Sequence, residues 1–384
     1  MKKIIFLLLC FTSIVNAQEI NKIDIQKSAK TFKLDTLKLK FSGEGFSFLK
    51  SEINANHFFL LGEYHNSNLV SKFTQSLFPE LKQSGFKVWV TEISPTSVNK
   101  LNSFLNSKNY LKEITAFNTK YGKNNNPIPF FSSKADFEML QESKNQDFQL
   151  WGIDQHFFGG FQFVMDDIFN GYDAKTKEEN KTIIADANKP NGDAAFNKIF
   201  DLSKNKLAPT IKQEMLASIA IYTDYSKGNY FLNNTVRSKL MKTNFYKYHS
   251  DFLKINKTDP KVFVKLGSNH VAKGLSPLGI ADFGNAIQQQ AELKNKKSLH
   301  IQLCYRYEYD NKNNLIDGLE AGDYPIELLE LYNENEWIII DLRPFQSKLY
   351  DLQLKKDAKI NLSKKMIDCI NQFDVLILSP EKYK

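Results

Sequence analysis

Two histidines in this chain follow the same pattern, in which an apolar run ends with glycine, two variable residues and histidine. The first run, HFFLLGEYH, ends with Gly62 and His65, and the second, KVFVKLGSNH, ends with Gly267 and His270. Each run is typical of a buried strand, and its glycine would let the chain turn tightly at the strand's carboxyl end. Ligands of open α/β sheets bind outside the carboxyl ends of the strands. We therefore expect both histidines in one site, although two unrelated strand ends could carry histidine by chance.

Acidic residues accompany these histidines at the ends of predicted strands. Glu63 shares the loop of His65, Glu92 ends the next apolar run, and Asp154 ends the one after it. A histidine beside a carboxylate can act as a general base on water, so we take Glu63, His65, Glu92 and His270 as candidate catalytic residues. His65, His270 and Glu92 are also residue types that bind a divalent metal ion. The carboxylates could instead cap helices or hold loop amides.

A second group of residues could bind a substrate. Arg237 and Asn244 lie at helical spacing on one face, and the chain has only three arginines. A guanidinium on such a face suggests recognition of a carboxylate or oxyanion, although an internal ion pair between helix and sheet would use the same residue. Asp154, Asn269 and His156 follow predicted strands and join this group, while His249, on a polar helix, is predicted to lie on the surface. His156 has aromatic neighbours that would also suit a packing role.

The elements that would position these residues are seven apolar, β-rich runs with helical patterns between them. They are His57–Glu63, Lys87–Ser94, Phe148–Gln155, Lys261–Ser268, Leu299–Tyr307, Trp337–Leu342 and Phe373–Ser379. Several are almost continuously apolar, as expected for strands covered on both faces. A helix is predicted from Leu69 to Ser84, and a strand–helix–strand unit implies a parallel pair. The sequence thus predicts an α/β fold with a mostly parallel sheet and helices on both faces.

The predicted organisation has two half-sheets separated by a helical segment. Residues 18–160 form the first half of the α/β domain and residues 258–384 the second. Residues 161–257 have no clear strand pattern and show helical periodicity at Ile211–Tyr225 and Asn233–Leu253, so we interpret them as a helical insertion or cap. The Asn- and Pro-rich segment 121–133 is a predicted loop and a candidate lid.

The first 17 residues have the features of a signal peptide. Lys2 and Lys3 precede a short apolar stretch, and small residues lead to a predicted cleavage after Ala17. The stretch is far shorter than the roughly 20 residues that span a bilayer. We therefore expect an exported protein, periplasmic or secreted, with no transmembrane segment after cleavage. In such a compartment Cys304 and Cys369 could pair, although Cys304 is equally well explained as a core thiol.

Composition and missing motifs limit the remaining functions. The net charge of +8 comes from dispersed lysines without a dense basic run interleaved with aromatics, so we expect no nucleic-acid partner. The G-x-S-x-G nucleophile motif, the Walker loop and the G-x-G-x-x-G fingerprint are all absent from the sequence. A serine nucleophile and nucleotide binding therefore have no support.

The two G-x-x-H motifs, with Glu92 between them, resemble the superfamily that joins erythromycin esterases, Tiki and TraB/GumN proteins, and ChaN-like haem-uptake proteins. The helix with Arg237 and Asn244, followed by the strand that leads to His270, is most similar to the erythromycin-esterase branch, as is the C-terminal FDVLILSP. The segment LLGEYHNSNLV is similar in length to the ChaN-like version. The esterase branch usually has a longer spacing and a following glycine where Asn66 stands here, which argues against cleavage of a macrolide ring.

The resemblance implies a role for each motif residue. Glu63 and His65 would be the acid–base pair, Glu92 and His270 would complete the site, and Arg237 would stabilise negative charge or bind substrate. The first hypothesis is an exported hydrolase of an ester or amide in a small-molecule or peptide substrate, with no cofactor or with a divalent metal. The second is a haem- or metal-binding protein without catalysis, in which the histidines would be axial ligands.

Overall fold

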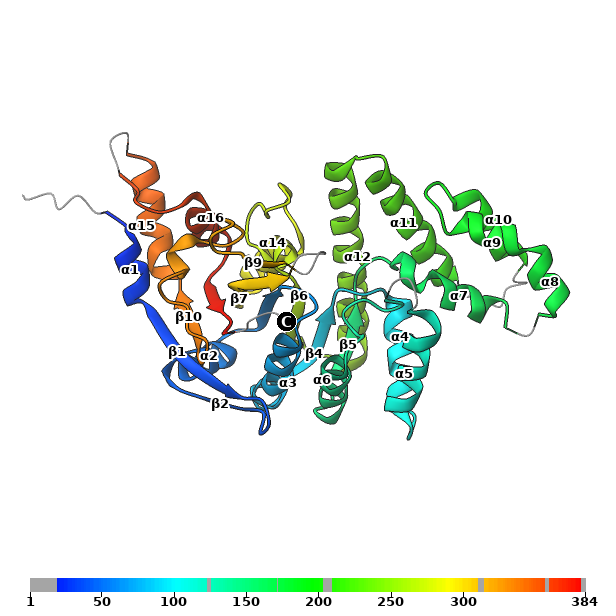
Figure 1. Ribbon diagram of the computed structural model, residues 1–384, viewed down its shortest axis with the longest axis horizontal. Helices are drawn as coiled ribbons and strands as arrows, with labels where there is room; N and C mark the ends of the chain where they lie inside the picture. The colour runs from blue at the N-terminus through cyan, green and yellow to red at the C-terminus, as the bar shows by residue number, and fades with distance from the viewer. Residues whose placement is uncertain are drawn as a thin grey trace, which may run out of the picture.

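The computed structural model describes residues 19–122, 126–170, 172–202, 209–309, 314–355 and 359–380. Their core is a nine-stranded sheet in the order β2-β1-β10-β11-β7-β3-β6-β4-β5 (Figure 1). In chain order the strands are β1 (Ala29–Asp35), β2 (Lys40–Ser42), β3 (Phe58–Glu63), β4 (Phe86–Thr91), β5 (Gln149–Gly152), β6 (Lys261–Gly267), β7 (Ser298–Cys304), β10 (Trp337–Asp341) and β11 (Val375–Leu378). A separate hairpin joins β8 (Tyr307–Tyr309) to β9 (Leu315–Asp317). The predicted signal peptide lies outside the described residues.

All seven predicted strands belong to this sheet, and six of them, from β11 to β5 in the sheet order, run parallel. β10 is antiparallel to β11, and β1 and β2 continue the sheet with antiparallel pairings. The predicted parallel pair of β3 and β4 is wrong in one respect. Both strands run the same way, but β6 lies between them and pairs with each, because the chain returns to the centre of the sheet after a long excursion.

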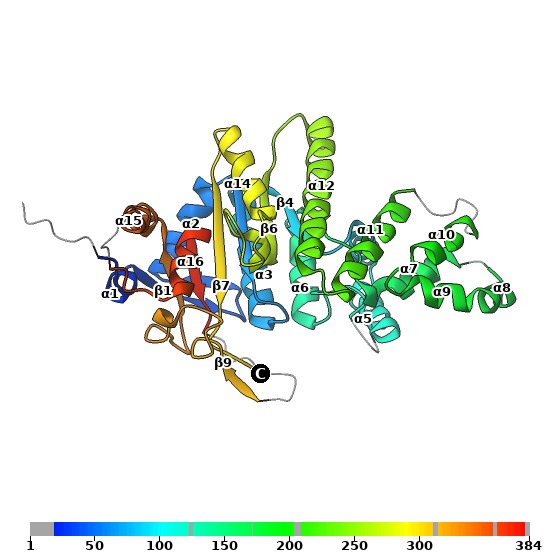
Figure 2. The same cartoon turned by 90° about the horizontal axis from the view of Figure 1, so that it is seen from above.

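Helices cover both faces of the sheet, as predicted (Figure 2). Alternate residues of β3 point to opposite faces, so Phe59 and Leu61 join one apolar cluster while Phe58 and Leu60 join the other. The first cluster includes α2 (Glu44–Ala55), α3 (Asn68–Gln83), α4 (Pro95–Leu105), α5 (Tyr110–Tyr121) and α6 (Lys134–Asn145). The second includes α1 (Lys22–Lys27), α12 (Tyr230–Asn256), α14 (Phe283–Leu293), α15 (Arg343–Gln353) and α16 (Lys364–Gln372).

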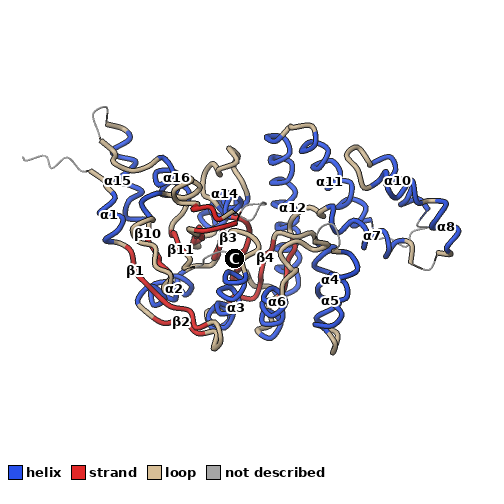
Figure 3. The backbone as a smooth tube through the Cα atoms, viewed as in Figure 1, coloured by secondary structure: helices blue, strands red, loops and turns tan. Residues whose placement is uncertain are grey.

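Between β5 and β6 the described residues form helices and connecting loops, without a strand. This region extends away from the sheet as helices and loops, and α12 then runs back beside β5 (Figure 3). Its other helices are α7 (Phe161–Ile168), α8 (Ala174–Glu179), α9 (Lys181–Ala187), α10 (Asp193–Leu202) and α11 (Pro209–Ser226). Its position fits the predicted insertion at residues 161–257, and the division of the chain into two half-sheets and a cap stays a prediction.

The prediction that His249 lies on the surface is wrong. His249 is buried on α12, and its Nε2 lies 2.7 Å from Asp259 Oδ1. The reason is helical spacing, because His249 shares a face with Met241, Phe245 and Phe252, which pack against the sheet. The polar neighbours in the sequence lie on the other side of the helix.

The two cysteines that could have paired are both buried and free. The thiol of Cys369 lies 3.1 Å from Gln302 Oε1. Within the described ranges, no helix combines the length and hydrophobicity that crossing a bilayer requires.

Candidate functional site

Four adjacent strands bring the predicted residues to one edge of the sheet. In the order β3, β6, β4 and β5, these strands end near His65, His270, Glu92 and Asp154. Both predicted histidines face Glu92. The Nε2 of His65 lies 3.9 Å from Glu92 Oε2, and the Nε2 of His270 lies 3.5 Å from Glu92 Oε1. The two halves of the chain therefore meet in one cluster.

The glycines of the two motifs are required by close packing at this edge. A Cβ atom on Gly62 would lie 2.6 Å from Val271 Cγ2, where α13 (Ser268–Val271) packs on β3. A Cβ atom on Gly267 would lie 2.9 Å from His65 Nε2 and 3.2 Å from Glu92 Oε2. Gly267 has φ −55° and ψ 142°, which any residue adopts, so the space above it explains the glycine better than the tight turn we predicted.

Glu63 is buried between His65 and Lys265. Its Oε1 lies 3.3 Å from His65 Nδ1, and its Oε2 forms an ion pair with Lys265. Burial opposes ionisation of Glu63, but the charge of Lys265 and the contact with His65 outweigh it, so the pKa of Glu63 is lowered. Burial also opposes a charged His65, yet the neighbouring Glu63 and Glu92 raise its pKa. The pair is therefore built to hold Glu63 as a carboxylate beside a more basic imidazole.

Glu92 is fixed at the centre of the cluster. Its Oε1 accepts a hydrogen bond of 2.6 Å from Arg237, and its Oε2 accepts one of 2.6 Å from the backbone N–H of Gly267. Burial would raise its pKa, but the charges of His270, His65 and Arg237 outweigh burial and lower the pKa of Glu92 to about 2. Glu92 is thus a permanent carboxylate facing both histidines.

Arg237 joins α12 to the ends of two strands. Its Nε donates to Asp154 Oδ1 at 3.0 Å, and one terminal nitrogen contacts both Asp154 and Glu92. About two turns further along α12, Asn244 donates from Nδ2 to the carbonyl oxygen of Ile153 at 2.9 Å. The internal ion pair that we weighed for Arg237 is therefore present. Substrate binding by Arg237, Asn244 and Asp154 stays a prediction.

His270 lies behind Glu92 and is buried. Its Nδ1 lies 2.8 Å from Asp282 Oδ2, and Asp282 also caps α14 by accepting a hydrogen bond from the backbone N–H of Phe283. Burial lowers the basicity of His270, but Glu92 and Asp282 outweigh it and raise its pKa. This geometry suits a charged partner of Glu92 more than a group that touches a substrate.

His156 lies apart from this cluster. It is buried, with Nδ1 3.1 Å from Ser94 Oγ, and its backbone N–H donates to Ser218 Oγ on α11. Burial lowers the pKa of His156 to about 4. It belongs to the packing between the strand ends and α11, the alternative that its aromatic neighbours suggested.

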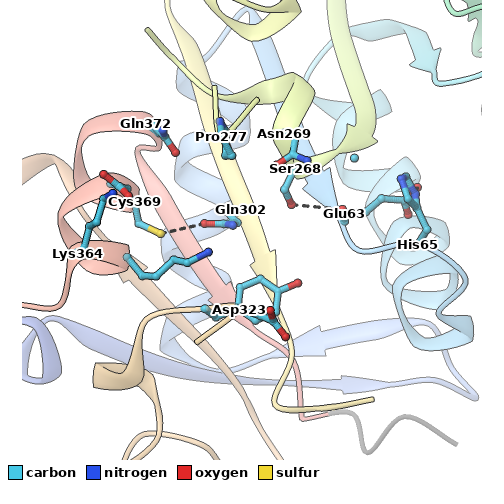
Figure 4. Close-up of a pocket in the computed structure, with 14 residues that line it drawn as sticks. Glu63, His65, Ser268, Asn269, Pro277, Gln302, Asp323, Lys364, Cys369 and Gln372 are labelled. Carbon is cyan, nitrogen blue, oxygen red and sulfur yellow. Dashed lines mark hydrogen bonds and ion pairs between the residues drawn. The ribbon is translucent and has the colours of Figure 1, made fainter. Parts of the chain in front are cut away.

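Two cavities flank His65, whose side chain is 33% exposed. The first, of about 490 Å³, is lined by Glu63, His65, Asn269 and residues of α16 that include Lys364 and Lys365. Figure 4 shows Glu63 and His65 on one side of it and Lys364, Cys369 and Gln372 on the other. The second, of about 570 Å³, is lined by Asn66, Arg237 and several aromatic side chains.

Phe130 separates His65 from the second cavity. Its ring stacks on the imidazole with centroids 4.1 Å apart and planes 22° apart. Phe130 has φ +65°, a left-handed conformation that costs a non-glycine residue free energy, so the surrounding loop must hold it there. This residue belongs to the segment 121–133 that we predicted as a lid.

Lys265, Asp282 and Phe130 were not among the predicted site residues. Lys265 had a readable signal, because it interrupts the apolar run KVFVKLG. Asp282 precedes the helical pattern FGNAIQQQAEL and could have been read as a cap. Phe130 gave no signal, because its place over His65 depends on how the loop folds.

The cluster does not fit a metal ion well. The two carboxylates that face His65 are each paired with a fixed cation, Arg237 for Glu92 and Lys265 for Glu63, so a divalent cation there would have to displace one of them. Across the described part of the chain, no group of three or more His, Cys, Asp and Glu side chains is arranged to hold a metal. The predicted set of His65, His270 and Glu92 meets as an ion-pair cluster, and we derive no step through a metal.

Comparison with known proteins identifies the fold. No family model and no curated protein sequence matches the chain. A solved structure of a histidine-to-asparagine mutant of the erythromycin esterase EreC, in its open conformation, matches with 14% identity over 93% of this chain and 98% of that chain (TM-score 0.56).

Two further solved structures match over nearly the whole chain. A Bacillus cereus protein is 15% identical over 94% of this chain and 97% of its own (TM-score 0.56), and a succinoglycan biosynthesis protein is 14% identical over 93% and 95% (TM-score 0.55). At these identities the likeness concerns the fold. The chain has an α/β fold like that of erythromycin esterase.

Proposed function

We propose that this protein is a hydrolase in which His65 activates water against an ester or amide bond of a small-molecule or peptide substrate. The observation that supports this most is the position of His65. It is one-third exposed between two cavities, and both of its ring nitrogens face buried carboxylates. The fold shared with an erythromycin esterase is compatible with such chemistry.

Glu63 would set the tautomer of His65. A carboxylate at Nδ1 accepts a hydrogen bond from the N–H of that nitrogen, which leaves the lone pair of the neutral ring on Nε2. Nε2 can then take a proton from a water molecule as the water attacks the carbonyl carbon, and return the proton to the leaving oxygen or nitrogen. Lys265 keeps Glu63 ionised throughout, because it compensates the buried charge.

Glu92 would stabilise the imidazolium that forms on His65. It carries a permanent charge, held by Arg237 and by the N–H of Gly267. Arg237 also lines the second cavity, where its positive charge would favour the oxyanion of the transition state. We assign His270 a positioning role, since it contacts Glu92 from the buried side.

The test is hydrolysis of a panel of 4-nitrophenyl esters and 4-nitroanilides by the wild type and His65→Ala. We expect turnover of at least one ester or anilide, and its loss in His65→Ala with the fold retained by circular dichroism. His57→Gln is the control, because His57 precedes β3 at the opposite end of that strand. Equal turnover by His65→Ala and the wild type would contradict the proposal.

The alternative is a haem-binding protein without catalysis. It has weaker support, because the ring nitrogens of His65 face Glu63 and Glu92 and the ring is stacked under Phe130. Haem added to the purified protein distinguishes the two. A Soret band that is lost in His65→Ala, together with no turnover of the panel, would favour the alternative.

We also propose that the protein is exported through its first 17 residues, which lie outside the described structure. Its lysines, short apolar stretch and small residues before Gln18 support this. Expression of the full chain in a bacterial host and mass spectrometry of the periplasmic fraction should find a chain that begins at Gln18. An intact N-terminus in the cytosol would contradict it.

A further inference from the structure

The second cavity beside His65 has an unusual lining. Five aromatic rings surround it, those of Phe130, Phe157, Phe158, Tyr222 and Tyr225. Five side-chain carboxamides lie among them, those of Asn66, Asn126, Gln155, Asn233 and Asn234. The only charged side chain among the described lining residues is that of Arg237, whose charge is already met by Asp154 and Glu92.

This lining selects for a particular kind of ligand. A charged ligand would find no counter-ion that is not already paired. A purely apolar ligand would leave the buried Gln155 Oε1 without a hydrogen-bond donor, and an unsatisfied buried polar group costs about 1–3 kcal/mol. A neutral ring with apolar faces and a hydroxyl-bearing edge avoids both costs, because its C–H faces lie on aromatic rings while its hydroxyls reach amide groups.

Two details support such a ligand. Phe158 and Tyr222 lie together with ring centroids 3.8 Å apart, and both are only partly buried, so they form an aromatic platform on one wall. Gln155 Oε1 is buried and has no hydrogen-bond partner among the described residues, although Gln155 lines the cavity. A ligand hydroxyl would supply the missing donor.

We propose that this cavity is a subsite for a neutral sugar ring and that the substrate of His65 is an ester of a sugar hydroxyl. This deepens the proposed function and rests on it. The sugar would lie between the aromatic walls beside Arg237, and its acylated oxygen would have to extend past the ring of Phe130 to reach His65. Water adds to the ester carbonyl, the bond from that carbon to the sugar oxygen breaks, and the proton removed by His65 passes to the sugar oxygen. The products are the free acid and the free hydroxyl.

A neutral peptide is the competing occupant, because it also pairs with amides and aromatic rings. The cavity, however, lies beyond the end of the edge strand β5, and none of the residues of that strand lines it. An extended peptide would therefore find no strand edge to pair with. We favour the sugar and make the peptide an outcome of the test.

The first test measures binding by saturation-transfer NMR. The probes are the methyl glycosides of glucose, galactose and mannose, cellobiose, and trialanine. We expect at least one sugar to bind and the double variant Phe158→Ala/Tyr222→Ala to bind it more weakly, by about two- to tenfold for each ring. Tyr350→Ala is the control, because Tyr350 is an exposed aromatic residue on α15. Binding of trialanine alone, no binding of any sugar, or unchanged binding by the double variant would overturn the proposal.

The second test separates the sugar subsite from the hydrolase proposal. We compare kcat/KM for the 6-acetate of the sugar that binds best with kcat/KM for ethyl acetate. The sugar ester should be preferred at least about tenfold, and the ratio of the two kcat/KM values should fall in the double variant. Hydrolysis of both esters without preference would overturn the sugar subsite and leave the hydrolase. Sugar binding with no ester hydrolysed would support the subsite and refute the hydrolase.

Discussion

Replacing Gly267 with alanine should disable the site without removing any functional group. The added methyl would lie 2.9 Å from His65 Nε2, whereas ordinary contacts of a Cβ begin at 3.4 Å. The imidazole must therefore retreat by roughly 0.5 Å. The backbone angles of Gly267 suit alanine, and the N–H that binds Glu92 is kept. The substitution therefore displaces His65 and, to a smaller extent, the Oε2 of Glu92, which would lie 3.2 Å from the added methyl.

The expected loss follows from this displacement. Misplacement of a reacting group by about 1 Å can cost about a hundredfold in rate, so we expect kcat to fall by about ten- to a hundredfold. Overpacking should cost about 1–3 kcal/mol of folding free energy. The assay is kcat and KM on the best ester of the panel, with urea unfolding at 25 °C. Gly318→Ala is the control, because its methyl would lie no closer than 3.4 Å to any of its neighbours, of which Tyr305 Cε2 is the nearest.

A second readout does not depend on turnover. Because Glu63 and Glu92 raise the pKa of His65, moving the ring away from them should lower that pKa in an NMR titration of the six histidines. A Gly267→Ala protein with wild-type kcat and an unchanged histidine titration would refute the idea that His65 must sit above Gly267.

Three further predictions concern charge. Lys265→Met should lower the free energy of unfolding by about 3–5 kcal/mol, because it leaves the buried carboxylate of Glu63 without its counter-ion. A change below about 1 kcal/mol in urea unfolding would contradict this. The exposed Lys247→Met is its control, with an expected change within about 0.5 kcal/mol. The rate of hydrolysis should rise with pH through the raised pKa of His65, because only the neutral ring accepts a proton. A rate that rises below pH 6.5, or that is flat from pH 5 to 9, would exclude His65 as the base. The pKa of Glu92 falls from 4.5 to about 2 on folding, so its contribution to stability is present above pH 4.5 and lost as the pH falls toward 2. Urea unfolding over this range should show a shallower pH dependence in Glu92→Gln.

The parallel part of the fold could be predicted because its strands are covered on both faces. The run KVFVKLG is apolar apart from its two lysines, and the structure places it as β6, which ends one residue before the predicted strand. β1 and β2 were missed because they lie at the sheet's edge. β1 buries only Phe32 fully among residues that include two lysines, so it lacks the apolar pattern of a strand.

The order of the strands was harder to predict than their existence. Periodicity tells which face of an element is buried but not which element covers it. Nothing in the sequence near β3 or β4 indicates that β6, about two hundred residues later, separates them. The site depends on this insertion, because β6 supplies both Lys265 beside Glu63 and Gly267 beneath His65.

The residues that meet at this sheet edge could be picked out of the sequence because burying a charged side chain at a strand end costs free energy unless it is paired. A carboxylate or histidine at the end of an apolar strand is partly buried by the fold itself, and burial of a charge must be offset by a partner. Glu63, Glu92 and Asp154 each have such a partner, which is Lys265 for the first and Arg237 for the other two. The cationic partners were harder to predict from the sequence, because each lysine or arginine reaches its carboxylate from a different helix or strand.

The helical region and the site are coupled through α12. Arg237 lies near the beginning of this helix, reaches Glu92 and Asp154 on two strands, and lines the aromatic cavity. α12 leads directly to β6, so the segment that anchors the helical region also determines where the second G-x-x-H motif enters the sheet. If Arg237 served only to join helix and sheet, an arginine flanked by two carboxylates would be a costly choice, since apolar residues of similar volume often pack as well or better. Arg237 also lines the cavity wall, so in the proposed reaction the same guanidinium that joins helix and sheet would face the oxyanion of the transition state.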